Sequence, residues 1–220
     1  MSTTLRKQGN IYCVVSRNTT ELSKIFVRLQ EFYESPFKEI RGKYFTLKEF
    51  KTIYSKNKGG VFTYYVDWDG FNVPGHIVLE FFKIFTDLSP RERLLKKLLN
   101  KALTANIPFY LIGIPKRLNK RILNHEIAHA FFYLSAKYKK SMLAAGRNLN
   151  KSIKKEVFKT LRKMGYSGIV KLDELQAYMA TTDISTLRYF FGKKVAVKHC
   201  RPFRRIFNKL NLSFRFLPHL

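Results

Sequence analysis

Residues 125–129 read His-Glu-Ile-Ala-His, and their types and spacing point to metal chemistry. Side chains four positions apart on a helix share one face, so His125 and His129 are able to bind one zinc ion together. Glu126 is then expected to act as the general base that deprotonates a zinc-bound water. The alternative is a pair of surface histidines with a salt-bridging glutamate between them. The apolar residues around the motif predict a largely buried helix, which favours the metal site.

A catalytic zinc site needs a third protein ligand, with the fourth position open. Six residues beyond the second histidine, where a third histidine is sometimes found, the chain has Ser135. It offers instead Glu174, which begins a Glu-x-x-Ala-x-x-Ala pattern at residues 174–180. We predict Glu174 as the third ligand and Asp173 as the acceptor of a hydrogen bond from a ligating imidazole. Both acids also fit a helix N-terminus, where carboxylates interact favourably with the helix dipole.

The two motifs together resemble the gluzincin branch of zinc metallopeptidases. The second motif is most similar to that of the small ImmA/IrrE-like members, and the resemblance spans residues 118–180. It implies a zincin-like core that hydrolyses peptide bonds, with Zn²⁺ held by His125, His129 and Glu174. Glu126 is the catalytic residue that the resemblance implies.

Two further parts of such a site stay open at the level of sequence. A tyrosine or histidine often stabilises the oxyanion of peptide hydrolysis, and the candidates are Tyr178, Tyr189 and His76. An extended peptide substrate pairs with the free edge of a strand. The strands predicted at residues 107–115 and 61–65 are equal candidates for that role.

Hydrophobic periodicity gives the elements that position these residues. Helices are predicted at 19–33, from the Thr46 capping box, at 89–104, from 118 past 138, at 151–164 and around Glu174. Strands are predicted at residues 11–15, 61–65 and 107–115, whereas the tail from Phe190 reads as strand-like or irregular.

Length and composition bound the class of protein. A chain of 220 residues with 45% hydrophobic residues is sufficient for a sizeable core. We predict an α+β fold, mostly helical around a small sheet. The expected parts are an N-terminal α/β subdomain at 1–86, a zincin-like catalytic core at 87–186 and a basic aromatic C-terminal region at 187–220. No apolar run suits a transmembrane segment, no signal peptide is evident, and the two cysteines make no disulfide framework. We therefore expect an intracellular protein.

The charge is the second informative feature. Lys and Arg total 42 against 15 Asp and Glu, a net charge of +27, and residues 111–220 hold 24 basic and 5 acidic residues. Such an excess attracts polyanions, of which nucleic acid is the commonest in a cell. An anionic membrane surface and a surface that serves only solubility are the alternatives. Arginines and phenylalanines interleave near the C-terminus, a mixture suited to phosphates and exposed bases: Arg201, Phe203, Arg204, Arg205, Phe207, Phe214, Arg215 and Phe216.

The sequence thus predicts a zinc-dependent metallopeptidase, with peptides or nucleic-acid-associated proteins as substrates. The competing hypothesis is a basic nucleic-acid-binding protein whose zinc site is not catalytic. Structural zinc sites usually close with four protein ligands, often cysteines, and here Cys13 and Cys200 are far apart in the chain. A zincin-like scaffold without proteolytic activity is a third hypothesis.

Overall fold

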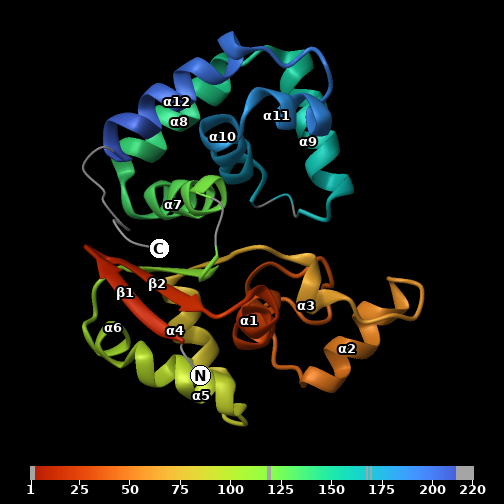
Figure 1. The fold of residues 1–220 in the computed structure, drawn as a ribbon, viewed down its shortest axis with the longest axis vertical. Coiled ribbons are helices and arrows are strands. Elements are labelled where there is room, and N and C mark those ends of the chain that lie inside the picture. The colour runs from red at the N-terminus through yellow and green to blue at the C-terminus, as the bar shows by residue number, and fades with distance from the viewer. Residues whose placement is uncertain (1–2, 118–119, 167, 169, 212–220) are drawn as a thin grey trace. The chain divides into compact units, whose positions relative to one another are not determined.

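The computed structural model describes residues 3–117, 120–166, 168 and 170–211 (Figure 1). These residues form twelve helices and a four-stranded mixed sheet, which confirms the predicted α+β class. The chain divides into two compact units, unit 1 (residues 1–118) and unit 2 (residues 119–219). The predicted boundary at 86/87 lies inside unit 1, and that at 186/187 lies inside unit 2. None of the described helices has the length and apolar character needed to cross a membrane.

The sheet lies in unit 1 and has the strand order β1-β2-β4-β3. The two central strands, β2 (Ile11–Ser16) and β4 (Tyr110–Pro115), are parallel and buried along their whole length. This burial explains why both read as continuous apolar runs. The outer strands, β1 (Thr4–Gln8) and β3 (Phe71–Pro74), pair antiparallel with them. From Tyr110 to Gly113, β4 is paired on both sides, so this part of the predicted strand has no free edge for a substrate.

Residues 61–65 do not form the predicted strand either. The chain is irregular from Val61 to Thr63, and Tyr64 begins the short helix α3 (Tyr64–Asp67). The Tyr64 ring is fully buried and packs edge-on against Phe50, with 5.1 Å between ring centroids. Aromatic packing therefore overrides the strand propensity of this segment.

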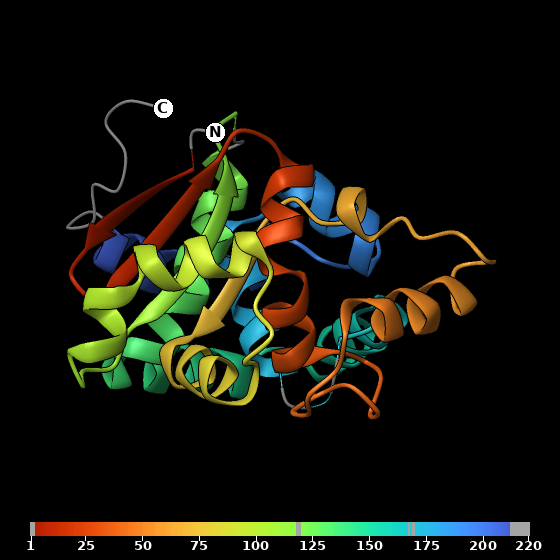
Figure 2. The same cartoon turned by 90° about the horizontal axis from the view of Figure 1, so that it is seen from below.

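The helix α1 (Thr19–Glu34) packs along the sheet (Figure 2). Its N-cap is Asn18, whereas the sequence predicted Thr19 or Thr20. Phe26 of α1 stacks on Phe71 of β3, with 5.2 Å between ring centroids. A Cβ atom at Gly113 of β4 would lie 2.6 Å from the Phe26 ring, so only glycine fits at this position.

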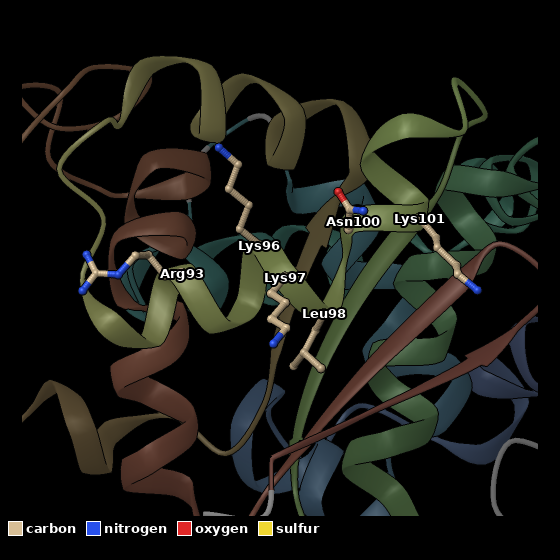
Figure 3. A pocket seen from close by; sticks show the side chains of 6 residues that line it. All are labelled: Arg93, Lys96, Lys97, Leu98, Asn100 and Lys101. Atoms are coloured by element: carbon tan, nitrogen blue, oxygen red, sulfur yellow. The ribbon is translucent and has the colours of Figure 1, made fainter.

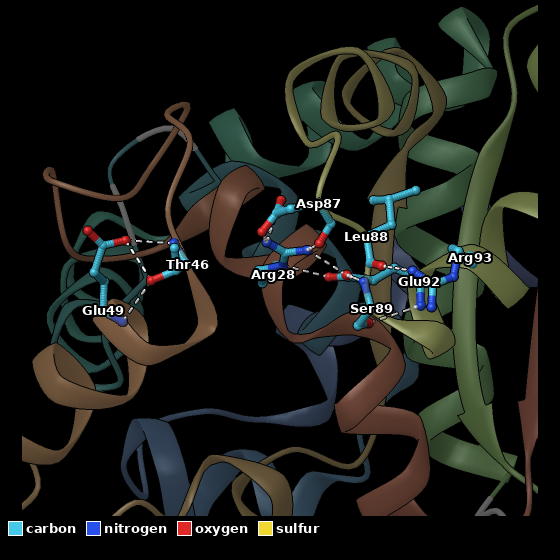
Figure 4. Close-up of polar contacts among 8 residues, drawn as sticks. All are labelled: Arg28, Thr46, Glu49, Asp87, Leu88, Ser89, Glu92 and Arg93. Atoms are coloured by element: carbon cyan, nitrogen blue, oxygen red, sulfur yellow. Dashed lines mark hydrogen bonds and ion pairs between the residues drawn. The ribbon is translucent and has the colours of Figure 1, made fainter.

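A buried ion pair joins α1 to the N-terminus of α5 (Pro90–Leu98) (Figure 4). The Arg28 guanidinium donates to both Glu92 carboxylate oxygens, at 2.8 and 2.6 Å, and to the Asp87 carboxylate at 3.1 Å. Glu92 also completes the predicted capping box with Ser89. The predicted helix at 89–104 is interrupted at Leu99, where α6 (Asn100–Thr104) begins.

The remaining helices of unit 1 are α2 (Leu47–Lys56) and α4 (Gly75–Ile84). Thr46 and Glu49 form the predicted capping box at the start of α2 (Figure 4). The described part of unit 2 contains only helices, and α10 (Lys171–Thr181) packs against the other helices around it (Figure 1). The others are α7 (Lys120–Leu134), α8 (Ala136–Asn148), α9 (Lys151–Lys163), α11 (Ile184–Phe191) and α12 (Val197–Asn211).

Two helices of unit 2 differ from their predictions. The helix expected to run past Tyr138 ends at Leu134, because Ser135 is extended and its hydroxyl caps α8 by accepting from the Tyr138 N–H. The tail from Phe190, expected to be strand-like or irregular, contains the four-turn helix α12. Pro202 lies inside α12 but is exposed, so water is able to bond the carbonyl that the proline leaves without its helical partner.

Candidate metal centre

The histidine motif lies on α7 and the Glu174 motif lies on α10, and these two helices pack against each other. Small residues at the contact permit a close approach, since Ala128 of α7 and Ala177 of α10 are fully buried. The Gln176 side chain of α10 donates to the Ala128 carbonyl of α7 at 3.2 Å. This packing brings Glu174 to the face of α7 that carries both histidines.

The three predicted ligands converge on one point. His125 Nε2 lies 3.2 Å from His129 Nε2. His129 Nε2 lies 3.5 Å from Glu174 Oε1, and His125 Nε2 lies 3.6 Å from Glu174 Oε2. In a tetrahedral zinc site with bonds of ~2.0–2.1 Å, ligand atoms are separated by about 3.3–3.4 Å. The three observed separations match a single four-coordinate cation.

The chemistry of the donor atoms also fits a cation. Glu174 Oε2 is buried and has no hydrogen-bond partner within the described residues, an arrangement that a bound metal would satisfy. Two imidazole nitrogens 3.2 Å apart need either a proton or a metal ion between them. Within the described ranges of the chain, these three residues are the one group of His, Cys, Asp and Glu side chains close enough to share a metal.

A chain of polar contacts supports His129 from behind. Asp173 Oδ1 lies 2.9 Å from His129 Nδ1, which leaves Nε2 directed at the other ligands. Gln176 Nε2 donates to Asp173 Oδ1 at 2.9 Å, and the Tyr138 hydroxyl of α8 donates to Gln176 Oε1 at 2.9 Å. Such contacts fix the orientation of a ligating imidazole. The sequence predicted Asp173 but not Gln176 or Tyr138, although a glutamine among the apolar residues of α10 signals a buried polar contact.

The site is electrostatically negative. Burial lowers the pKa of the His129 imidazole, but the charges of Asp173, Glu174 and Glu126 outweigh burial and raise it to about 10. Burial raises the pKa of Glu174, and the neighbouring His129 and His125 bring it below its ordinary value. Three carboxylates around two imidazoles therefore favour the binding of a cation.

Glu126 and Tyr178 complete the surroundings of the ligands. Glu126 is buried on α7, and its charge raises the pKa of both His129 and Tyr178. The Tyr178 ring packs edge-on against His125, with 4.8 Å between ring centroids. Burial, followed by the Glu174 charge, raises the pKa of Tyr178 to about 12, so its hydroxyl stays protonated at neutral pH.

Tyr178, one of the three predicted oxyanion-stabilising residues, is in contact with a predicted ligand. Tyr178 packs on His125, whereas the Tyr189 side chain on α11 is 84% exposed. His76 belongs to α4 of unit 1. Within unit 2, these observations favour Tyr178 over Tyr189.

Unit 1 contains a pocket of about 680 Å³ at the junction of α5 and α6 (Figure 3). Its charged side chains point away from one another in Figure 3 rather than towards a common centre. They do not form a convergent binding site for one ligand. The lining residues are Arg93, Lys96, Lys97, Leu98, Asn100 and Lys101.

Neither a protein family, nor a curated protein, nor a solved structure matches this chain.

Proposed function

We propose that this protein is a zinc-dependent metallopeptidase in which His125, His129 and Glu174 hold the metal. The observation that carries this proposal is the set of separations of 3.2, 3.5 and 3.6 Å among their donor atoms. Bound zinc would supply Lewis acidity, which polarises the scissile carbonyl and lowers the pKa of water towards ~7.

The residues around the ligands have the chemical properties that peptide hydrolysis requires. The Glu126 carboxylate accepts a proton from the attacking water and later delivers it to the leaving amine. The Tyr178 hydroxyl, which stays protonated, is able to donate a hydrogen bond to the oxyanion that develops on the carbonyl oxygen. Asp173 and Gln176 keep the His129 ring in one orientation throughout.

The second candidate function is nucleic-acid binding with a non-catalytic zinc site, which the net charge of +27 favours. A structural zinc site usually closes with four protein ligands, and the described residues bring together three. A buried glutamate beside the histidines is also unnecessary for a structural site. The geometry therefore supports the metallopeptidase better.

Zinc content and peptide cleavage test the proposal together. The purified wild type is expected to hold one zinc per chain, and alanine at His125, His129 or Glu174 should remove or greatly weaken it. Glu126→Gln should retain zinc and lower turnover by on the order of 10²–10⁴-fold, because the amide cannot accept a proton. The matched control is Glu156→Gln, an exposed acid on α9.

The substrate for this assay is a set of unstructured peptides of varied sequence, with products identified by mass spectrometry. Full zinc occupancy in Glu174→Ala would exclude Glu174 as the third ligand. Undiminished cleavage by Glu126→Gln would refute the proposed mechanism. A zinc-loaded wild type that cleaves none of the peptides would favour the second candidate function.

A further inference from the structure

The exposed face of α12 carries a line of four cations. Lys198, Arg201, Arg205 and Lys209 are exposed and stand at positions i, i+3, i+7 and i+11. At 100° per residue they lie within an arc of about 80°, and the line is about 16 Å long. We call these four residues the basic stripe.

The opposite face of α12 fixes the stripe in place. Cys200, Phe203 and Phe207 are buried, and the Phe207 ring packs against Phe131 of α7 with 5.9 Å between centroids. Arg204 is not part of the stripe, because its guanidinium donates to the Thr182 carbonyl at 2.8 Å, at the end of α10. Phe203 and Phe207, which were expected to meet exposed bases, are therefore core residues. Phe214, Arg215 and Phe216 lie outside the described residues.

Within the described residues, no ion pair neutralises the charge of the stripe. The α12 sequence contains no Asp or Glu. Within the part of the chain that the structure describes, none of the four cations forms an ion pair with a carboxylate. Like charges at helical spacing repel one another, so the bare stripe is destabilising for the helix. A line of anions from a partner would reverse this effect.

We infer that the basic stripe binds the phosphate backbone of duplex nucleic acid. Insertion into a membrane requires an exposed apolar helix face, and that of α12 is buried in unit 2. Binding of single strands relies on exposed aromatic rings that stack on bases, and the stripe presents none. A line of about 16 Å corresponds to roughly five base pairs of duplex. This inference is independent of the metal centre and goes beyond the proposed function.

The helix α9 supplies a matched control. Lys151, Lys155, Lys159 and Arg162 are also exposed and occupy a similar arc, but the exposed Glu156 stands among them and reduces their net charge. Replacing all four by glutamine removes the same charge from unit 2 as replacing the basic stripe by glutamine. Glutamine keeps the helix propensity high in both variants.

The test is the binding of the full-length protein to fluorescent duplexes of two unrelated sequences between about 50 and 200 mM salt. The wild type should bind both alike, with affinity that falls steeply as salt rises. The stripe variant should flatten the slope of log K against log salt by up to about 3.6, since each phosphate contact contributes about 0.9. The α9 variant should change the slope much less. Arg201→Lys with Arg205→Lys should retain the slope, because lysine also neutralises a phosphate.

Several outcomes would overturn the inference. Equal loss of slope in the two glutamine variants would assign the binding to diffuse charge. If the wild type binds a single strand more tightly than the duplex, the stripe has a single-stranded partner. If it binds anionic lipid vesicles more tightly than either nucleic acid, the partner is a membrane surface. Absence of wild-type binding at the lowest salt would refute the nucleic-acid reading. Unchanged zinc content and circular dichroism in each variant would show that the fold is intact.

Discussion

Replacing Asp173 by asparagine or by alanine is expected to weaken zinc binding in two steps. Asp173 Oδ1 lies 2.9 Å from Nδ1 of His129, whose side chain is only 2% exposed. Asparagine keeps an oxygen that accepts from the imidazole but removes the negative charge. Alanine removes both, so that the ring is free to turn and its Nε2 is no longer held towards the other ligands.

The size of each step follows from this contact. A hydrogen bond to a charged group contributes about 1.5–3 kcal/mol, and a neutral one about 0.5–1.5 kcal/mol. The Asp173 side chain is 18% exposed, and water weakens the contact, so the lower half of each range applies. Asp173→Ala should then lose about 1.5–2 kcal/mol, a rise in Kd of roughly 10–30-fold. Asp173→Asn should lose about 1 kcal/mol, or roughly fivefold.

Competition with a chromophoric zinc chelator at neutral pH measures these affinities. Glu156→Gln is the control, since it makes the same change in net charge on the surface of unit 2. Urea unfolding of the metal-free variants checks that each retains its fold. A Kd for Asp173→Ala within about twofold of the wild type would refute the reasoning. A larger loss in Asp173→Asn than in Asp173→Ala would refute it as well.

Two further predictions concern stability. Burial raises the pKa of the Glu31 carboxyl from 4.5 to about 7, so the native state keeps this proton longer than the unfolded chain does. This proton's contribution to the free energy of unfolding is complete below pH ~4.5 and is lost by pH ~7, a fall of about 3 kcal/mol. Glu31→Gln should abolish the fall. Urea unfolding at several pH values, followed by the fluorescence of the single Trp68, measures it. Gly113→Ala should destabilise unit 1 by about 1–3 kcal/mol, because the added Cβ would overlap the Phe26 ring. Gly146→Ala should be tolerated, because its added Cβ would lie 3.7 Å from the nearest atom. Thermal unfolding followed by circular dichroism compares the two variants. Identical pH profiles for the wild type and Glu31→Gln, or equal stability of the two alanine variants, would contradict these predictions.

The histidine motif was predictable because its geometry is local. Residues 125 and 129 share a helix face whatever the rest of the chain does, and α7 places them together. The end of the same helix was not predictable from periodicity. The apolar pattern continues beyond Leu134, and only the Ser135 hydroxyl, which caps α8, separates the two helices.

The position of Glu174 beside the histidines depends on tertiary packing, yet the sequence motif around Glu174 indicated it as a ligand. The alanine three positions later lets α10 approach α7, and this approach brings the carboxylate within 3.6 Å of both imidazoles. The Tyr138–Gln176 contact has a weaker signal, because the apolar residues around Gln176 indicate a buried polar contact but do not identify a partner 38 residues away. Sequence reasoning thus brought together the predicted ligands and Asp173, and missed Gln176 and Tyr138 behind them.

The errors at residues 61–65 and after Phe190 share a cause. Both segments are rich in residues with high strand propensity, and such propensity is easily overridden by packing. In α12, Phe203 and Phe207 are four positions apart and share one helix face. This correction moves the aromatic rings into the core and leaves the cations as a line on the surface.

The distribution of charge in unit 2 connects the two inferences. Residues 119–219 contain five acidic side chains, and three of them (Glu126, Asp173 and Glu174) surround the histidines. Asp183 pairs with Arg121, which leaves Glu156 as the remaining surface acid. Carboxylates are concentrated where a cation would bind, and the helices around them expose mainly cations. Under the two proposals, unit 2 would hold a metal ion inside and contact a polyanion outside, and the proposed peptidase would then work on nucleic-acid-associated proteins.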